Sequence, residues 1–169
     1  MERKREFMSD VVWEKILRDY IVPYRHVQNS DSPPTFIGHK DTEPLIDKKL
    51  PARLSSLAAA APDMKIDVYS NGVLLPKWAE RGDDFMDFLA TLPCQVRYMM
   101  SYHPRNHDDS VNDYTATILY LQEVLQDRRP PNVEFVTVSH RSRWVSERDQ
   151  EWWRQTWLNY PITVHSNCS

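Results

Sequence analysis

The feature that most constrains the fold is a repeated alternation of short apolar runs with amphipathic segments along the chain. The apolar runs are rich in Val, Ile, Tyr and Phe and are bounded by Pro, Gly, Asn or Ser, which is typical of buried strands. We expect strands at residues 35–37, 65–69, 95–101, 133–138 and 161–165. We expect a first helix that begins at Ser9 and runs through Tyr20, and further helices at residues 48–61, 84–92, 110–125 and 146–157.

This alternation predicts an α/β fold built from parallel βαβ units, whose crossovers are right-handed almost without exception. An open doubly wound sheet and a curled barrel fit the spacing equally well. In both architectures the ligand site lies at the carboxyl ends of the strands. Because no linker or low-complexity stretch interrupts the pattern, we expect residues 1–169 to form a single domain.

Composition narrows the function classes. The formal net charge of −3 provides no broad basic surface, so neither a nucleic acid nor a membrane surface is an expected partner. The apolar runs are far shorter than the roughly 20 residues that a membrane-spanning helix needs. Cys94 and Cys168 are too far apart in sequence for a local metal clip, which indicates a reducing compartment. We therefore expect a cytoplasmic protein.

Three polar segments follow the first three expected strands. Residues 43–47, with the sequence Glu-Pro-Leu-Ile-Asp, come shortly after the first strand, and Ser70-Asn71-Gly72 closes the second. The third strand ends at Ser101. Because carboxyl ends of parallel strands meet at one edge of a sheet, these segments are the candidate site.

In their order and separation these segments resemble the radical S-adenosylmethionine (radical SAM) superfamily. Its members have a glycine-rich turn followed by Glu-Pro-Leu after the second strand, a third strand that ends in Ser/Thr-Asn-Gly, and a fourth strand whose terminal Ser lies near the nucleoside. The resemblance covers about residues 9–138. It implies a partial (β/α) barrel of the radical SAM type in which five of the usual six core strands are present and the first is missing.

The resemblance also implies a cofactor site. S-adenosylmethionine would be bound by Glu43, Ser70, Asn71 and Ser101, with the Glu43 carboxylate accepting hydrogen bonds from the cofactor's ammonium group. Such a charge-assisted contact is worth roughly 1.5–3 kcal/mol. No catalytic or metal-ligating residue is assigned in this chain. Many relatives act on peptides or on cofactor precursors, and the sequence does not identify the substrate.

The chain departs from the family pattern in two respects. The family holds a 4Fe–4S cluster with three cysteines spaced Cys-x3-Cys-x2-Cys, and this cluster and the cofactor carry out the radical chemistry. That cluster segment precedes the helix that begins here at Ser9, so the chain is expected to start just downstream of it and to be a fragment or a degenerate member, inactive as given. Restoring the upstream segment would give a radical SAM enzyme. The second departure is Asp41-Thr42, which stands where glycines are usual.

Two other function classes remain open. Four histidines fall at or just beyond expected strand ends, where imidazoles hold the metal of barrel hydrolases. They are His39, His103, His140 and His165. The third class is a non-catalytic binding module. Trp153 and Trp157 are four residues apart and share a helix face, which is typical of core residues. The alternative is that they cover the gap left by the missing first strand.

Overall fold

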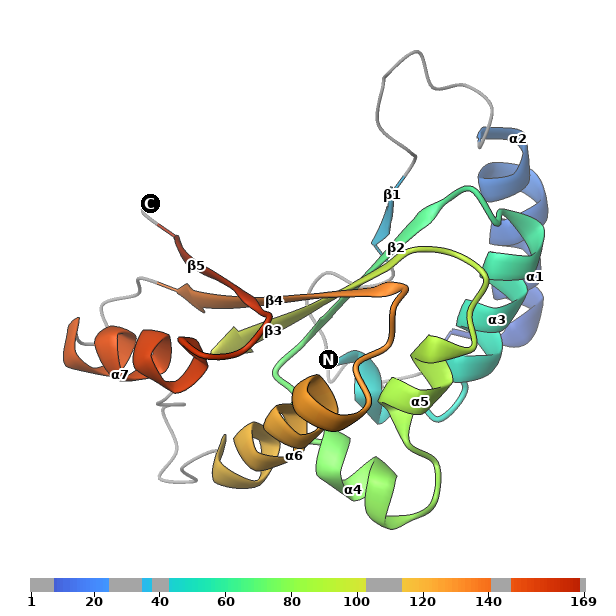
Figure 1. The fold of residues 1–169 in the computed structure, drawn as a ribbon. Helices are drawn as coiled ribbons and strands as arrows, with labels where there is room; N and C mark the ends of the chain where they lie inside the picture. Colours follow the sequence, from blue (N-terminus) through green and yellow to red (C-terminus); the bar gives the residue numbers. More distant parts are fainter. Residues whose placement is uncertain (1–7, 25–34, 38–42, 103–113, 141–146, 168–169) are drawn as a thin grey trace, which may run out of the picture.

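The fold is α/β and contains a five-stranded parallel sheet (Figure 1). The computed structural model describes residues 8–24, 35–37, 43–102, 114–140 and 147–167. The strands follow the expected order along the chain: β1 (Thr35–Ile37), β2 (Lys65–Ser70), β3 (Val96–Tyr102), β4 (Val133–His140) and β5 (Thr163–Asn167). Each boundary lies within two residues of the expected one.

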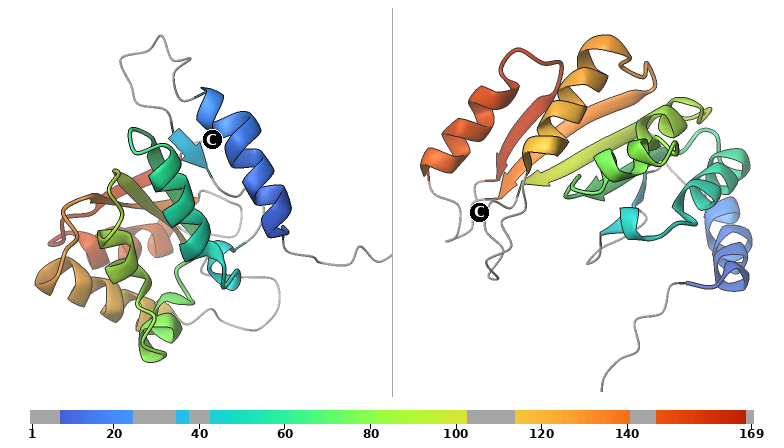
Figure 2. Two further views of the ribbon diagram at one scale, coloured as in Figure 1. Left: turned by 90° about the vertical axis from the view of Figure 1, so that its right-hand side faces the viewer. Right: turned by 90° about the horizontal axis from the view of Figure 1, so that it is seen from below.

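The strand order in the sheet is β1-β2-β3-β4-β5 and every neighbouring pair is parallel. A doubly wound sheet reverses its strand order at a switch point. The sheet of the described residues has no such reversal, so its crossovers all wind in one direction. Figure 2 accordingly shows the crossover helices along one face of the sheet.

The helices alternate with the strands as expected. Asp10–Ile16 (α1), Leu17–Ile21 (η1) and Val22–Tyr24 (α2) form one continuous segment, and the Ser9 hydroxyl caps its first turn by accepting from the amide of Val12 at 3.3 Å. Between β1 and β2 lie Pro44–Ile46 (η2) and Leu50–Ala60 (α3). The others are Leu75–Glu80 (α4), Phe85–Ala90 (α5), Tyr114–Asp127 (α6) and Glu147–Trp157 (α7). The predicted caps Ser110 and Ser146 lie outside the described residues.

The helix α4 was not expected from the sequence. It follows the Ser70-Asn71-Gly72 turn and carries Pro76 in its first turn, where proline's missing amide hydrogen costs nothing. A helix of six residues makes fewer than two turns, too short for a periodic apolar pattern to distinguish it from a loop.

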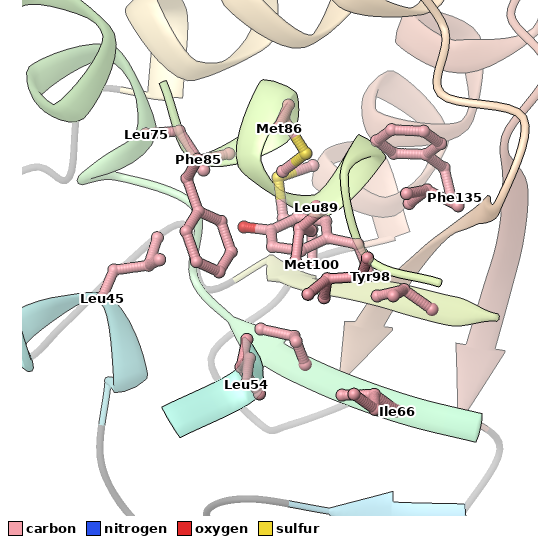
Figure 3. Packing of buried hydrophobic residues seen from close by; sticks show 14 of the residues in the cluster. Leu45, Leu54, Ile66, Leu75, Phe85, Met86, Leu89, Tyr98, Met100 and Phe135 are labelled. Carbon is pink, nitrogen blue, oxygen red and sulfur yellow. The ribbon is translucent and has the colours of Figure 1, made fainter. Parts of the chain in front are cut away.

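The core lies between the sheet and these helices. Side chains of β3 alternate strictly: Val96, Tyr98, Met100 and Tyr102 are buried against the helices, and the intervening residues are only partly buried. Figure 3 shows Tyr98 and Met100 of β3 packed with Leu54 of α3, Phe85 and Leu89 of α5, Leu75 of α4, and Phe135 of β4. This alternation is what a strand with one helix-covered face requires.

The other face of the sheet, which we call the open face because no helix of the described residues lies on it, carries an ionic network. Val136 and Val138 of β4 are nevertheless buried on this face. Asp67, Arg97 and Glu134 occupy one row across β2, β3 and β4. Both Arg97 Nε and Nη2 donate to the Asp67 carboxylate, whose side chain is fully buried, and this raises the pKa of Arg97. Lys65 Nζ lies 2.7 Å from Glu134 Oε2. Two positive and two negative groups therefore neutralise one another on this face.

The tryptophans of α7 belong to the core rather than to the β1 side of the sheet. Trp153 and Trp157 are 0% and 1% exposed, and Trp153 stacks on Tyr102 with a ring separation of 4.1 Å. Because α7 lies at the β5 end, opposite α1 and β1 (Figure 1), these tryptophans do not cover a gap beside β1. The core position that their spacing indicates is confirmed, and the alternative that they cover such a gap is wrong.

No helix within the described parts of the chain is long and apolar enough to cross a membrane.

Candidate functional site

The candidate site lies where β1 and β2 end. The two strands are parallel neighbours, with Ile37 opposite Asp67, so their carboxyl ends lie at the same edge of the sheet. Glu43 precedes η2, and its extended backbone conformation together with Pro44 at the first helical position fixes the start of that turn. This placement brings the Glu43 side chain to the end of β2.

The Glu43 carboxylate joins the two segments that the sequence analysis singled out. Its Oε1 accepts a hydrogen bond from the Ser70 hydroxyl at 2.7 Å and one from the Leu45 amide at 3.1 Å. Its Oε2 accepts one from the Asn71 amide at 2.8 Å. A carboxylate has about four acceptor positions, so three of them are filled within the chain.

The Ser70-Asn71-Gly72 turn is also held by hydrogen bonds from its own polar side chains. Ser70 Oγ accepts from the Gly72 amide at 2.9 Å, and Asn71 Oδ1 accepts from the Val73 amide at 3.0 Å. The Gly72 carbonyl accepts from Thr117 Oγ1 of α6 at 3.3 Å. These are the local bonds by which short polar side chains fix turns. The side chains of Ser70 and Asn71 therefore already make hydrogen bonds that stabilise the fold. We call the set Glu43, Ser70, Asn71 and Gly72 the strand-end clasp.

Ser101, the fourth candidate, is not part of the clasp. Ser70 pairs in register with Met100, which faces the helices, so Ser101 one residue later faces the other way. The Ser101 side chain is partly exposed, and its carbonyl accepts from the Tyr114 hydroxyl at 3.5 Å. The structure thus brings three of the four predicted residues together and leaves Ser101 on the open face.

Tyr98 lies beneath the clasp and was not anticipated from the sequence. Its ring is buried in the core, and its hydroxyl has no hydrogen-bond partner of good geometry among the described residues. Burial raises the pKa of Tyr98 well above its ordinary value. The nearby Ser70 hydroxyl lowers this pKa, whereas the charge of Glu43 raises it. Only the alternating burial pattern of β3 could have identified it, as a core residue.

Gly72 provides a test of how tightly the clasp is packed. Its φ of 76° is in the left-handed region, and a Cβ there would lie 3.0 Å from both Met100 Sδ and Thr117 Cγ2. We expect Gly72→Ala to lower the free energy of unfolding by about 2–3 kcal/mol, from backbone strain and crowding together. Urea titration followed by circular dichroism measures this loss.

Gly82→Ala is the matched control. Gly82 has nearly the same φ, 82°, but a Cβ there meets nothing within 4 Å. Its replacement should cost only the backbone strain, about 1 kcal/mol. Equal losses in the two variants would mean that the clasp is not closely packed on β3 and α6.

A groove of about 960 Å³ lies elsewhere, on the helix side of the molecule. It is bordered by Leu45 and Ile46 of η2, Pro51 of α3, Trp78 of α4 and Phe88 of α5. None of the four predicted site residues lines it. The clasp residues contact one another instead of facing this hollow.

The cysteines do not fit a 4Fe–4S cluster. The family's cluster needs three thiolates, and the chain has two cysteines. Cys94 is 4% exposed, and burial raises the pKa of its thiol, which disfavours the thiolate that binds iron. Cys168 lies outside the described residues. No chemical step can be assigned to a cluster on this chain.

The described part of the chain also offers no centre for the alternative metal site. It contains no group of three or more His, Cys, Asp or Glu side chains that could hold a metal ion. His165 pairs with Val138 in the middle of β5 and is exposed, rather than ending the strand as expected. His140 is the last residue of β4, whereas His39 and His103 lie outside the described residues.

Comparison of the chain with protein-family models, with curated proteins and with solved structures finds no match in any of the three.

Proposed function

We propose that this chain is a fragment or a degenerate member of the radical SAM enzymes, a partial (β/α) barrel that performs no radical chemistry by itself. The observation that carries the proposal is the contact of Glu43 with Ser70 and Asn71 across the ends of two parallel strands. The sequential strand order with helices along one face also supports it, because a curled barrel is wound in this way.

The clasp supports a limited binding role. With three of its acceptor positions filled, the Glu43 carboxylate has about one left for a ligand's ammonium group at the sheet edge. Ser70 and Asn71 would hold this carboxylate in place rather than bind the ligand. Ser101 would add a contact only for a ligand that extends from the carboxyl ends of the strands onto the open face.

The cysteines limit what this chain can do by itself. A cluster, when bound in the family, supplies the electron that starts the reaction. This chain's own residues do not hold one, so what remains is orientation of a ligand by one charge-assisted hydrogen bond. Binding by such a contact is weak, and we expect a dissociation constant on the order of 1 mM for S-adenosylmethionine.

Titration of the isotope-labelled chain with S-adenosylmethionine, followed by amide NMR shifts, tests the proposal. We expect saturable shifts at the Leu45, Asn71 and Gly72 amides, and about tenfold weaker binding in Glu43→Gln, because the neutral amide loses the charge-assisted bond. Glu80→Gln, on the exposed surface of α4, is the matched control and should bind like the wild type.

The wild-type shift map does not depend on any variant folding. Shifts confined to residues far from the clasp, or none at ligand concentrations of about 5 mM, would contradict the proposal. Under anaerobic conditions with iron, sulfide and a reductant, the chain should neither take up a cluster nor cleave the ligand.

A further inference from the structure

The groove on the helix side of the molecule is built from matching faces of α4 and α5. From α4 and its two ends it takes Leu74, Lys77, Trp78 and Arg81. These residues are three or four apart and therefore share one face of the helix. α5 and its ends contribute residues at the same spacing, and η2 with the start of α3 closes the third side. The volume of about 960 Å³ is in the range of small-molecule sites, roughly 300–1,000 Å³.

The aromatic part of this lining is held in place. Trp78 Nε1 donates to the Leu45 carbonyl at 3.1 Å, and the Trp78 ring packs edge-on against Phe85 with ring centroids 5.6 Å apart. Trp78 and Phe88 are only partly buried, and Ile46 is 56% exposed. A ligand can therefore cover apolar surface here without first ordering the Trp78 side chain.

Within the described residues, the cations of the groove form no ion pair. Three of the five lysines in the described residues pair with carboxylates: Lys15, Lys49 and Lys65. The two that do not, Lys48 and Lys77, both line the groove. Arg81 is exposed and likewise has no ion pair with a described residue. Three unpaired positive charges thus gather at one place on a chain whose formal net charge is −3.

Two of the three acids in the lining already have partners. Asp84 accepts hydrogen bonds from two backbone amides, from the Tyr120 hydroxyl and from Arg128. Asp87 also accepts from Arg128. Among the described lining residues, Asp83 is the one acid that forms no ion pair. The charges left without a partner are three cations and one carboxylate, which favours an anionic ligand.

The two parts of the lining together define the chemistry of the ligand. Trp78 shares its face of α4 with Lys77 and Arg81, so an apolar group on its ring has cations beside it. A purely apolar ligand would leave these cations without a partner, and an inorganic anion would leave the apolar surface in water. A nucleic acid needs a broader basic surface than three side chains provide. A small molecule with an apolar body and one carboxylate matches both parts.

We propose that the groove between α4, α5 and η2 binds a small hydrophobic carboxylate. The apolar body lies on Trp78, Phe88 and Ile46, and the carboxylate is bound by Lys48 and Lys77. This site goes beyond the binding role of the clasp and does not rest on it, because no clasp residue lines the groove.

Titration of the isotope-labelled full chain with 1-naphthylacetate, and with its neutral counterpart 1-naphthylacetamide, tests the anionic and the apolar contact separately. The Trp78 indole N–H and the Gly82 and Phe88 amides are the NMR reporters, since all three residues line the groove. We expect saturable shifts with both compounds. The dissociation constant should be on the order of 1 mM or below for the carboxylate, and about tenfold higher for the neutral amide.

Removing the two lysines should remove most of the preference for the anion. In Lys48→Gln/Lys77→Gln we expect about fivefold weaker binding of naphthylacetate and unchanged binding of naphthylacetamide, because only the charge contact is lost. Lys49→Gln is the matched control, since Lys49 is adjacent and exposed but outside the lining, and both compounds should bind it like the wild type. Ile46→Ala should weaken the binding of both compounds about threefold, whereas Leu119→Ala, similarly exposed but on α6, should weaken neither.

Three results would overturn the proposal: equal affinity for the two naphthalene compounds, an equal loss in Lys49→Gln, or no shift of the Trp78 indole at about 5 mM ligand. Shifts of this indole with an acidic, leucine-rich peptide but with neither compound would assign the groove to a protein partner instead. Because the substituted side chains are all exposed, each variant should fold like the wild type by circular dichroism. The Asn71 and Gly72 amides report on the clasp, so a failure of S-adenosylmethionine to bind there is a separate result.

Discussion

Replacement of Trp153 by alanine is expected to lower the free energy of unfolding by about 3–5 kcal/mol, the range for removing a fully buried large aromatic side chain. Trp153 is 0% exposed and lies parallel to Tyr102, with ring planes 5° apart. Its indole Nε1 donates to Thr137 Oγ1 at 2.8 Å, inside the core. The variant would lose the stacking and the hydrogen bond and would leave a cavity between α7, β3 and β4.

Trp152→Ala is the control for this variant. Trp152 is the adjacent residue of α7 but is 49% exposed, and its ring lies tilted at 5.9 Å from that of Tyr102. We expect its loss to cost under about 1 kcal/mol. Urea unfolding followed by circular dichroism measures both losses. Similar losses in the two variants would contradict the core position of Trp153.

Replacement of Arg97 by methionine is the second large expected effect, a loss of about 2–4 kcal/mol in the free energy of unfolding. The cost comes from Asp67, whose side chain is fully buried and would lose both hydrogen bonds from the guanidinium. Arg97 itself is 32% exposed, so the opposite change, Asp67→Val, leaves a cation that water can still reach. We therefore expect Asp67→Val to cost less than Arg97→Met.

The double variant Asp67→Val/Arg97→Met separates charge burial from packing. Because it leaves no unpaired charge, its stability should return to within about 1 kcal/mol of the wild type. Glu134→Gln serves as the control: it weakens the neighbouring but exposed Lys65 pair and should cost under about 1 kcal/mol. Urea unfolding of the four variants measures these differences. Additive losses in the double variant would show that the two side chains act independently.

Part of the candidate site could be predicted from the sequence and part could not. The juxtaposition of Glu43 with Ser70 and Asn71 follows from two consecutive strands that pair in parallel, since that pairing places their ends together. The direction of the Ser101 side chain does not follow, because it depends on the register between β2 and β3. A shift of one residue moves a side chain to the other face of the sheet, and the strand boundary predicted from the sequence was one residue early.

The sequence by itself determined that the chain alternates strands and helices and that the strands are parallel, because both properties follow from local periodicity and from the length of the connections. Only the tertiary structure decided between a doubly wound sheet and one wound in a single direction, since that choice depends on which strand lies beside which. It also decided that the Glu43 carboxylate accepts hydrogen bonds from the chain's own amides, and that α1 and α7 lie at opposite ends of the sheet. These properties arise from contacts between residues far apart in sequence, for which a single sequence has no local signal.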